Sequence, residues 1–197
     1  ISEGIIPRAL VRKFSASKIS STCELVYGDI QDETAVQDTI RDTEAIIYNI
    51  GIIRQFLDKG ITYTSLNYEG VRHCIQIAEK MGVKRFILMS ANGVKQEGTR
   101  YQRTKWEADK ALQASKLHWT IFRPSLIFGN PRGQGRTEFC TQLRNDMLSL
   151  PFPAPLFYEG LLPINVGTFA MSPIHVENVA EFFVKAINQD ESIGKVF

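Results

Sequence analysis

The stretch that decides the fold is residues 85–105, which read RFILMSANGVKQEGTRYQRTK. Its first six residues form an apolar run, typical of a buried strand, that ends at Ser90. A polar loop follows, and a helix is predicted to begin near Tyr101. Lys105 stands four residues later, so the two side chains share one helical face. A lysine ammonium beside a phenol favours the phenolate and is expected to lower the pKa of Tyr101, which suits proton transfer to or from a carbonyl or alcohol oxygen.

Strand-like and helix-like segments alternate on both sides of this stretch. Such alternation is typical of βα units built on a parallel sheet with covering helices, so we predict an α/β fold of the doubly wound type. In open sheets of this kind ligands bind at the carboxyl ends of the strands, where Ser90 lies. The run 44–50 is apolar enough to be buried on both faces. The predicted strands are 7–12, 24–27, 44–50, 85–90, 119–123 and 195–197, and the predicted helices are 32–42, 64–81, 101–115, 138–148 and 176–188.

Length and composition indicate one ordinary globular domain over 1–197. The hydrophobic fraction of 44% and the charged fraction of 22% exclude a disordered chain. A net charge of +2, from scattered lysines and arginines, gives no basic stripe for nucleic acid. No apolar run is long enough to span a membrane, and no signal peptide is recognisable. The three cysteines form no zinc or disulfide pattern, so we expect no metal and a reducing, cytoplasmic location.

The segment of about 129–173 breaks the βα rhythm and is predicted to form a small cap on the main domain. Within it, residues 150–162 are apolar and aromatic. They are expected either to line a substrate pocket or to dock a protein partner, since apolar patches of this kind mark interaction sites.

Taken in order, these motifs resemble the extended and atypical branches of the short-chain dehydrogenases/reductases, which have the Rossmann fold. The likeness covers nearly the whole chain. It is strongest to NAD(P)-binding, sugar-epimerase-like and NmrA-like proteins, including the nucleotide-binding accessory subunit of respiratory complex I. The motifs that carry it are Asp29, Asn49-Ile50-Gly51, Ser90, Tyr101-x-x-x-Lys105, Arg123-Pro124-Ser125 and Pro173-Ile174-His175-Val176.

The resemblance implies a role for each matching residue. Tyr101 matches the catalytic acid/base, Lys105 the lysine that holds the nicotinamide ribose, and Ser90 the hydroxyl that orients the substrate oxygen. Asn67 matches an asparagine that bonds across to the active-site strand. The remaining matches are cofactor contacts: the adenine pair Asp29 and Ile30, the turn Asn49, Ile50 and Gly51 beside phosphates and ribose, and Pro124 and Ser125 against the nicotinamide.

The sequence departs from the family at its start. The glycine-rich turn that seats the cofactor's pyrophosphate is not in it, and neither is the strand before that turn. In the family these precede a helix whose tail would match Ile1 to Gly4. Either they lie upstream, which we expect because residues 5 onward are in family register, or dinucleotide binding is lost. The last strand also looks cut off, so the domain is expected to be incomplete at both ends.

Arg12 and Lys13 close the first predicted strand, where NAD-specific relatives offer an acidic residue to the ribose. Cations there suit the 2′-phosphate of NADP, so we expect NADP to be preferred over NAD. The alternative is that both are ordinary surface charges.

Two functions follow from the resemblance. One is an NADP-dependent oxidoreductase or nucleotide-sugar epimerase-like enzyme that uses Ser90, Tyr101 and Lys105 on a small-molecule substrate. The other is a non-catalytic dinucleotide-binding sensor, assembly factor or accessory subunit. Family members often dimerise through helices that include the one bearing Tyr101. The resemblance therefore leaves two kinds of partner open, a second copy in a homodimer or another protein at the apolar cap segment.

Overall fold

A computed structural model describes residues 4–13, 22–52, 54–130, 141, 144–145, 149 and 172–197. The chain divides into two compact units, each described by itself. The first comprises Ile1–Arg123 and Lys185–Phe197, and the second comprises Pro124–Val184.

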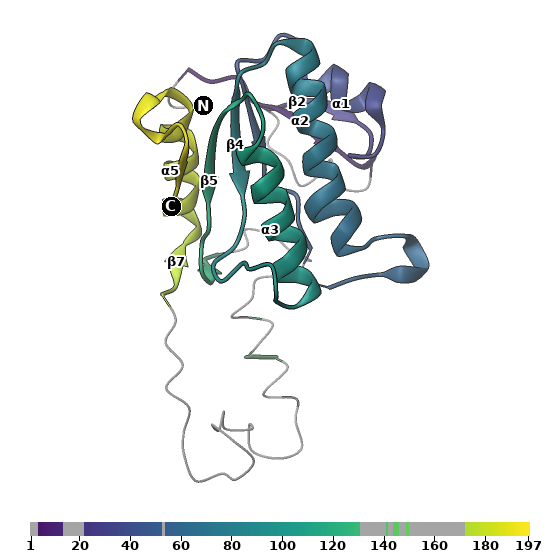
Figure 1. The fold of residues 1–197 in the computed structure, drawn as a ribbon, viewed down its shortest axis with the longest axis vertical. Helices are drawn as coiled ribbons and strands as arrows, with labels where there is room; N and C mark the ends of the chain where they lie inside the picture. Colours follow the sequence, from purple (N-terminus) through teal and green to yellow (C-terminus); the bar gives the residue numbers. More distant parts are fainter. Residues whose placement is uncertain are drawn as a thin grey trace. The chain divides into compact units, whose positions relative to one another are not determined.

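The first unit alternates strands and helices, as the sequence predicts (Figure 1). Its strands are parallel, and they form the pair β1-β2 and the four-stranded sheet β3-β4-β5-β8. The prediction of an α/β fold with a parallel sheet is therefore confirmed. The elements are β1 (Arg8–Val11), β2 (Glu24–Tyr27), α1 (Glu33–Ile40), β3 (Ala45–Tyr48), α2 (Gly70–Met81), β4 (Arg85–Met89), α3 (Arg100–Gln113), β5 (His118–Phe122), the end of α5 (Val176–Asn188) and β8 (Lys195–Val196).

The core lies between β4 and the helices α2 and α3. Phe86 and Leu88 are buried and join one cluster with Ile77 and Ala78 of α2 and Leu112 of α3. The pattern expected for buried central strands thus holds for β4. It is wrong for β3, because Ile47 is 39% exposed. In the described part of the chain β3 is the outermost strand of its sheet, so its side chains have neighbouring strands on one side only.

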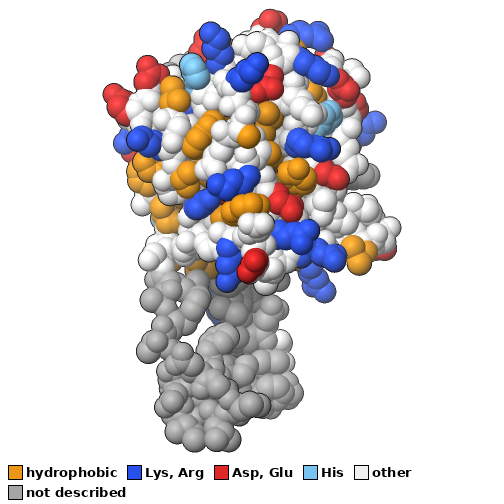
Figure 2. Space-filling model, in the orientation of Figure 1, with side chains coloured by type: hydrophobic (Ala, Val, Ile, Leu, Met, Phe, Trp, Pro, Cys, Tyr) orange, Lys and Arg blue, Asp and Glu red, His pale blue; other side chains and the backbone are white. Residues whose placement is uncertain are grey.

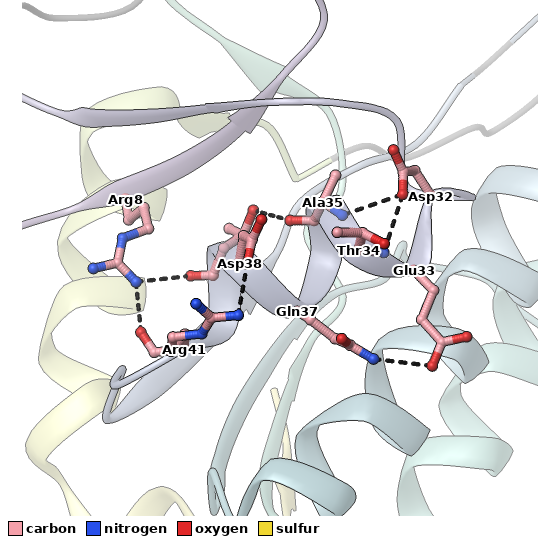
Figure 3. Close-up of polar contacts among 9 residues, drawn as sticks. Arg8, Asp32, Glu33, Thr34, Ala35, Gln37, Asp38 and Arg41 are labelled. Carbon is pink, nitrogen blue, oxygen red and sulfur yellow. Dashed lines mark hydrogen bonds and ion pairs between the residues drawn. The ribbon is translucent and has the colours of Figure 1, made fainter.

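Residues at the helix ends explain where the helices begin and stop (Figure 3). Asp32 Oδ1 accepts hydrogen bonds from the backbone N–H groups of Thr34 and Ala35 and so caps α1. At the other end of α1, Arg8 donates to the carbonyl oxygen of Arg41 at 2.5 Å. The α2 helix ends at Gly82, whose φ of +77° is a left-handed conformation that favours glycine.

The helix predicted over 64–81 is present, but its first part is wound differently. Thr64–Glu69 form a π-helix, and the α-helix proper begins at Gly70. The π turn buries both Ser65 and Asn67. A Cβ on Gly70 would collide with the Tyr48 hydroxyl, so only glycine lets α2 approach β3 this closely.

A buried arginine ties the C-terminal segment to the sheet. Arg85, on β4, is 8% exposed and donates to the carbonyl oxygens of His118 and Ala186, at 2.6 and 3.1 Å respectively. It also donates to the hydroxyls of Thr120 and Ser192, both at 2.7 Å. Burial lowers the pKa of this guanidinium, and Asp190 partly opposes the effect.

In the second unit the short strands β6 (Ile127–Phe128) and β7 (Ile174–His175) pair in parallel, and α5 follows directly. The predicted last helix is confirmed. The predicted helix 138–148, the apolar stretch 150–162 and most of the predicted cap 129–173 lie outside the described residues.

Charges of both signs are scattered over the described surface shown in Figure 2. Among the helices of the described residues, none combines the length and apolarity needed to cross a membrane.

Candidate functional site

The carboxyl ends of β3, β4 and β5 meet at one edge of the sheet. The strands are adjacent and parallel, with Tyr48 beside Leu88 and Met89 beside Phe122. The segments that follow them begin at Asn49, Ser90 and Arg123. Sequence-predicted site residues therefore leave the sheet at the same edge, as parallel topology requires.

Lys105 reaches this edge from α3. Its side chain is 5% exposed, and Nζ donates to the carbonyl oxygen of Met89, the last residue of β4, at 3.0 Å. Burial lowers the pKa of the Lys105 ammonium to about 8, although the negative charge of Asp109 raises it. A cation held in this way is costly to the fold, as expected for a functional group rather than for a surface lysine.

Gly51 lies against the lysine. A Cβ at this position would come within 3.0 Å of Lys105 Nζ and 3.5 Å of Asn67 Oδ1. The missing side chain therefore leaves space beside an ammonium and an amide oxygen.

Ser90 is fixed by its backbone and open at its side chain. Its N–H donates to the Phe122 carbonyl oxygen at 2.8 Å. The hydroxyl is buried and has no hydrogen-bond partner within the described residues.

Tyr101 lies in the first turn of α3 and is half-buried. Its ring packs edge-on against Tyr63, with the centroids 5.7 Å apart. Burial, and secondarily Tyr63, raises the pKa of the phenol. The expectation that Lys105 lowers this pKa is therefore wrong for the protein alone, because burial raises it and Lys105 Nζ instead donates to the Met89 carbonyl oxygen.

Asn67 connects the site's segments in a way that the sequence did not indicate. Its Nδ2 donates to the Thr104 hydroxyl of α3, and its Oδ1 accepts from the Ile52 N–H, both at 3.4 Å. The asparagine therefore links α3 to the loop after β3, whereas the expected bond was to the active-site strand.

The other residues predicted to contact a cofactor follow several different strands and do not all lie beside Lys105. Arg12 and Lys13 are exposed after β1, and Asp29 is exposed after β2, where its Oδ1 accepts from the Gln31 N–H. Ile30 is 5% exposed and belongs to the core. Asn49 is exposed and Ile50 half-buried after β3. Pro124 and Ser125 open the second unit, which is described separately.

Sequence reasoning missed Asp109. This residue follows Lys105 by one helical turn, is fully buried, and accepts a hydrogen bond from Arg123, the residue after β5, with which it also forms an ion pair. The spacing of four from Lys105 was a usable signal, because it places the carboxylate on the same face of α3.

The residues at this edge fit a dinucleotide on the evidence of their donors. Two donors lie here, the Lys105 ammonium and the Ser90 hydroxyl, which has no hydrogen-bond partner within the described residues. Ribose and carboxamide oxygens accept hydrogen bonds from such donors, and the missing side chain of Gly51 leaves space beside the ammonium. Fold and site together define a nucleotide-binding α/β domain. The chain belongs to the NAD(P)H-binding family, whose sequence model matches residues 1–146.

Known proteins agree with this assignment. The N-acetyl-alpha-D-glucosaminyl-diphospho-ditrans,octacis-undecaprenol 4-epimerase of Escherichia coli O157:H7 is 21% identical over 174 residues, which cover 79% of this chain and 49% of that protein. The chain thus spans about half the length of this curated relative.

Two solved structures share the fold. A short-chain dehydrogenase/reductase superfamily protein from Agrobacterium tumefaciens with bound NAD has a TM-score of 0.73 at 17% identity, covering 100% of this chain and 70% of its own. A wide-type short-chain dehydrogenase/reductase from Veillonella parvula DSM 2008 in complex with NADP has a TM-score of 0.57 at 13% identity, covering 96% and 79% respectively. Structures of this fold therefore hold either cofactor, and the predicted resemblance is confirmed for the NAD(P)H-binding family and for the fold.

Proposed function

We propose that the protein is an NAD(P)-dependent oxidoreductase or epimerase-like enzyme whose chemistry is carried by Ser90, Tyr101 and Lys105. The observation that carries this proposal is the buried ammonium of Lys105, held at the carboxyl end of β4 beside Gly51. A domain that only packs its core has no need of such a cation. The 4-epimerase relative supports a diphosphate-linked sugar as the substrate class.

The three side chains have separate tasks in this proposal. Tyr101 carries the proton to or from the substrate oxygen, and because its pKa is raised it starts as the neutral phenol. Ser90 holds the same oxygen through its free hydroxyl. Lys105 provides positive charge beside the ribose and stabilises the phenolate when it forms. When bound at this edge, the nicotinamide cofactor would supply the hydride-transfer chemistry.

The proposal is tested by following NAD(P)H absorbance across a panel of carbonyl compounds and nucleotide sugars. Tyr101→Phe should lower turnover by roughly two to four orders of magnitude while leaving dinucleotide affinity nearly unchanged. Tyr68→Phe is the matched control, because Tyr68 lies on the preceding π turn and should leave turnover unchanged. Equal turnover in the Tyr101 variant and the unaltered protein would reject the proposed role.

We also propose a preference for NADP over NAD through Arg12 and Lys13. Both are exposed at the end of β1, where a 2′-phosphate can accept charge-assisted hydrogen bonds. Calorimetry on the full-length protein should give the tighter dissociation constant for NADP. Arg12→Ala should bring the dissociation constants for NADP and NAD closer together. Lys116→Ala removes another exposed charge and should leave both dissociation constants unchanged. Equal or tighter binding of NAD would count against this preference.

A second candidate is a non-catalytic dinucleotide-binding sensor, assembly factor or accessory subunit. The observation that favours it is that the matching family model describes NAD(P)H binding and names no reaction. It predicts dinucleotide binding with no turnover on any substrate of the panel, together with a stable protein partner in pull-downs.

A further inference from the structure

Asp109 is a fully buried carboxylate with unequal oxygens. Its Oδ2 accepts a hydrogen bond from Arg123 Nε at 2.9 Å and forms an ion pair with Arg123 Nη2 at 2.8 Å. Its Oδ1 has no hydrogen-bond partner in the described part of the chain. A buried oxygen without a partner is rare in native proteins, because it has lost its water and gained no hydrogen bond in exchange.

Ser90 offers the donor that Asp109 Oδ1 lacks. Its hydroxyl is the other buried side-chain atom without a hydrogen-bond partner among the described residues. The two groups lie outside hydrogen-bond geometry, yet Ser90 is near enough to lower the pKa of the Asp109 carboxyl. A small approach of the two side chains would satisfy both atoms at once, with the hydroxyl donating and Oδ1 accepting.

The charges around Asp109 come from two elements. Lys105 lies one turn earlier on α3, and Arg123 follows β5. Both cations lower the pKa of the carboxyl, whereas burial, the largest influence, raises it. Because Arg123 binds Asp109 Oδ2, Asp109 Oδ1 remains available to Ser90 and Lys105.

We propose that Asp109 is a positioning residue of the site formed by Ser90 and Lys105. Asp109 Oδ1 accepts a hydrogen bond from the Ser90 hydroxyl, and the negative charge of Asp109 keeps Lys105 protonated. A serine hydroxyl has one proton and two lone pairs. When the proton is directed to Asp109, Ser90 offers only lone pairs to a ligand. It then accepts a hydrogen bond from a substrate hydroxyl and binds a carbonyl oxygen less well. This last step rests on the proposed function, and it assigns the alcohol form of the substrate as the better ligand.

The first test needs neither cofactor nor substrate. Lysine labelled with ¹³C at Cε reports the titration of Lys105 by NMR. Asp109→Asn should move its titration midpoint down by on the order of one pH unit, because an attractive charge is lost. The matched control is Glu107→Gln, which removes the same charge from the same helix where Glu107 pairs with Arg103. An unchanged midpoint in Asp109→Asn, or an equal change in Glu107→Gln, would overturn the proposal.

Ser90→Ala provides an independent measurement should Asp109→Asn fail to fold. Loss of the serine donor should raise the titration midpoint of the Asp109 carboxyl, followed by the ¹³Cγ shift of labelled aspartate. A midpoint that does not move, or a carboxyl that is already protonated at neutral pH in the unaltered protein, would overturn the proposed hydrogen bond.

Kinetics then separate this inference from the proposed enzyme activity. Once a carbonyl substrate and its alcohol product are known to turn over, KM is measured for both. In protein that keeps Ser90, Asp109→Asn should lower the ratio of the carbonyl KM to the alcohol KM several-fold. In protein that carries Ser90→Ala, Asp109→Asn should leave this ratio unchanged. If no substrate turns over, the proposed function fails while the NMR titrations still decide the role of Asp109.

Discussion

Replacement of Lys105 by methionine should stabilise the protein while removing its proposed activity. The pKa of Lys105 falls from 10.5 to about 8 on folding, chiefly through burial. At about 1.4 kcal/mol for each pKa unit, the charged lysine costs the fold about 3 kcal/mol. Methionine has a similar length and no charge, but it leaves the Met89 carbonyl without its donor, which costs about 1–2 kcal/mol. The net gain is about 1–2 kcal/mol, or roughly 2–8 °C in Tm for a chain of this size.

The gain should depend on pH in a defined direction. The folded protein releases the lysine proton near pH 8, whereas the unfolded chain holds it to about pH 10.5. Between these values the unfolded state binds more protons, so the contribution of Lys105 to the stability of the unaltered protein rises with pH. The advantage of Lys105→Met is therefore full below about pH 8 and declines toward about pH 10.5.

Urea unfolding followed by circular dichroism at several pH values measures this difference. Lys110→Met is the control, because Lys110 is exposed on the same helix and its loss should give no comparable pH-dependent gain. The reasoning would be refuted if Lys105→Met were less stable than the unaltered protein at neutral pH, or if its advantage did not shrink in alkali.

Three further predictions concern the fold. Asp32→Ala removes the α1 cap and should cost about 1 kcal/mol in urea unfolding, whereas Asp32→Asn, which keeps an acceptor, should cost less. Gly70→Ala should destabilise the protein by on the order of 1–3 kcal/mol, or roughly 2–12 °C in Tm, because its Cβ meets the Tyr48 hydroxyl; an unaltered Tm would show that α2 can shift freely. Burial raises the pKa of the Cys74 thiol to about 12, so Cys74 should react with a thiol reagent only after denaturant is added. If Cys74 reacted in the folded protein as fast as an exposed cysteine, this prediction would be wrong.

The alternation of strands and helices was readable because each element has its own local signal. The β4 strand is apolar from Phe86 to Met89, and Gly82 marks the end of α2. The exposure of Ile47 was not readable, because it depends on which strands pair with β3 rather than on the composition of β3. Likewise the π turn over Thr64–Glu69 differs from an α-helix by one backbone hydrogen-bond register, which side-chain periodicity over six residues cannot resolve.

Positions in the site were more predictable than their contacts. Parallel topology brings Asn49, Ser90 and Arg123 to one edge, and the spacing of Tyr101 and Lys105 follows from helical geometry. The raised pKa of Tyr101 depends on how deeply the ring is buried against Tyr63, which no spacing reveals. Asp109 escaped notice because a carboxylate in a helix normally faces solvent, and its burial is explained only by Arg123 arriving from β5.

Arg85 has a consequence for the order in which the molecule is made. The guanidinium sits on β4, but several of its acceptors are 101 to 107 residues further along the chain, in the last turn of α5 and just beyond it. A ribosome releases the N-terminal strands first, at roughly 5–20 residues per second. During that interval Arg85 has only its β5 acceptors, His118 and Thr120, and lacks those of Ala186 and Ser192. Burial of β4 is therefore completed only when Ser192 has emerged, so nascent chains halted before Ser192 should remain protease-sensitive at β4.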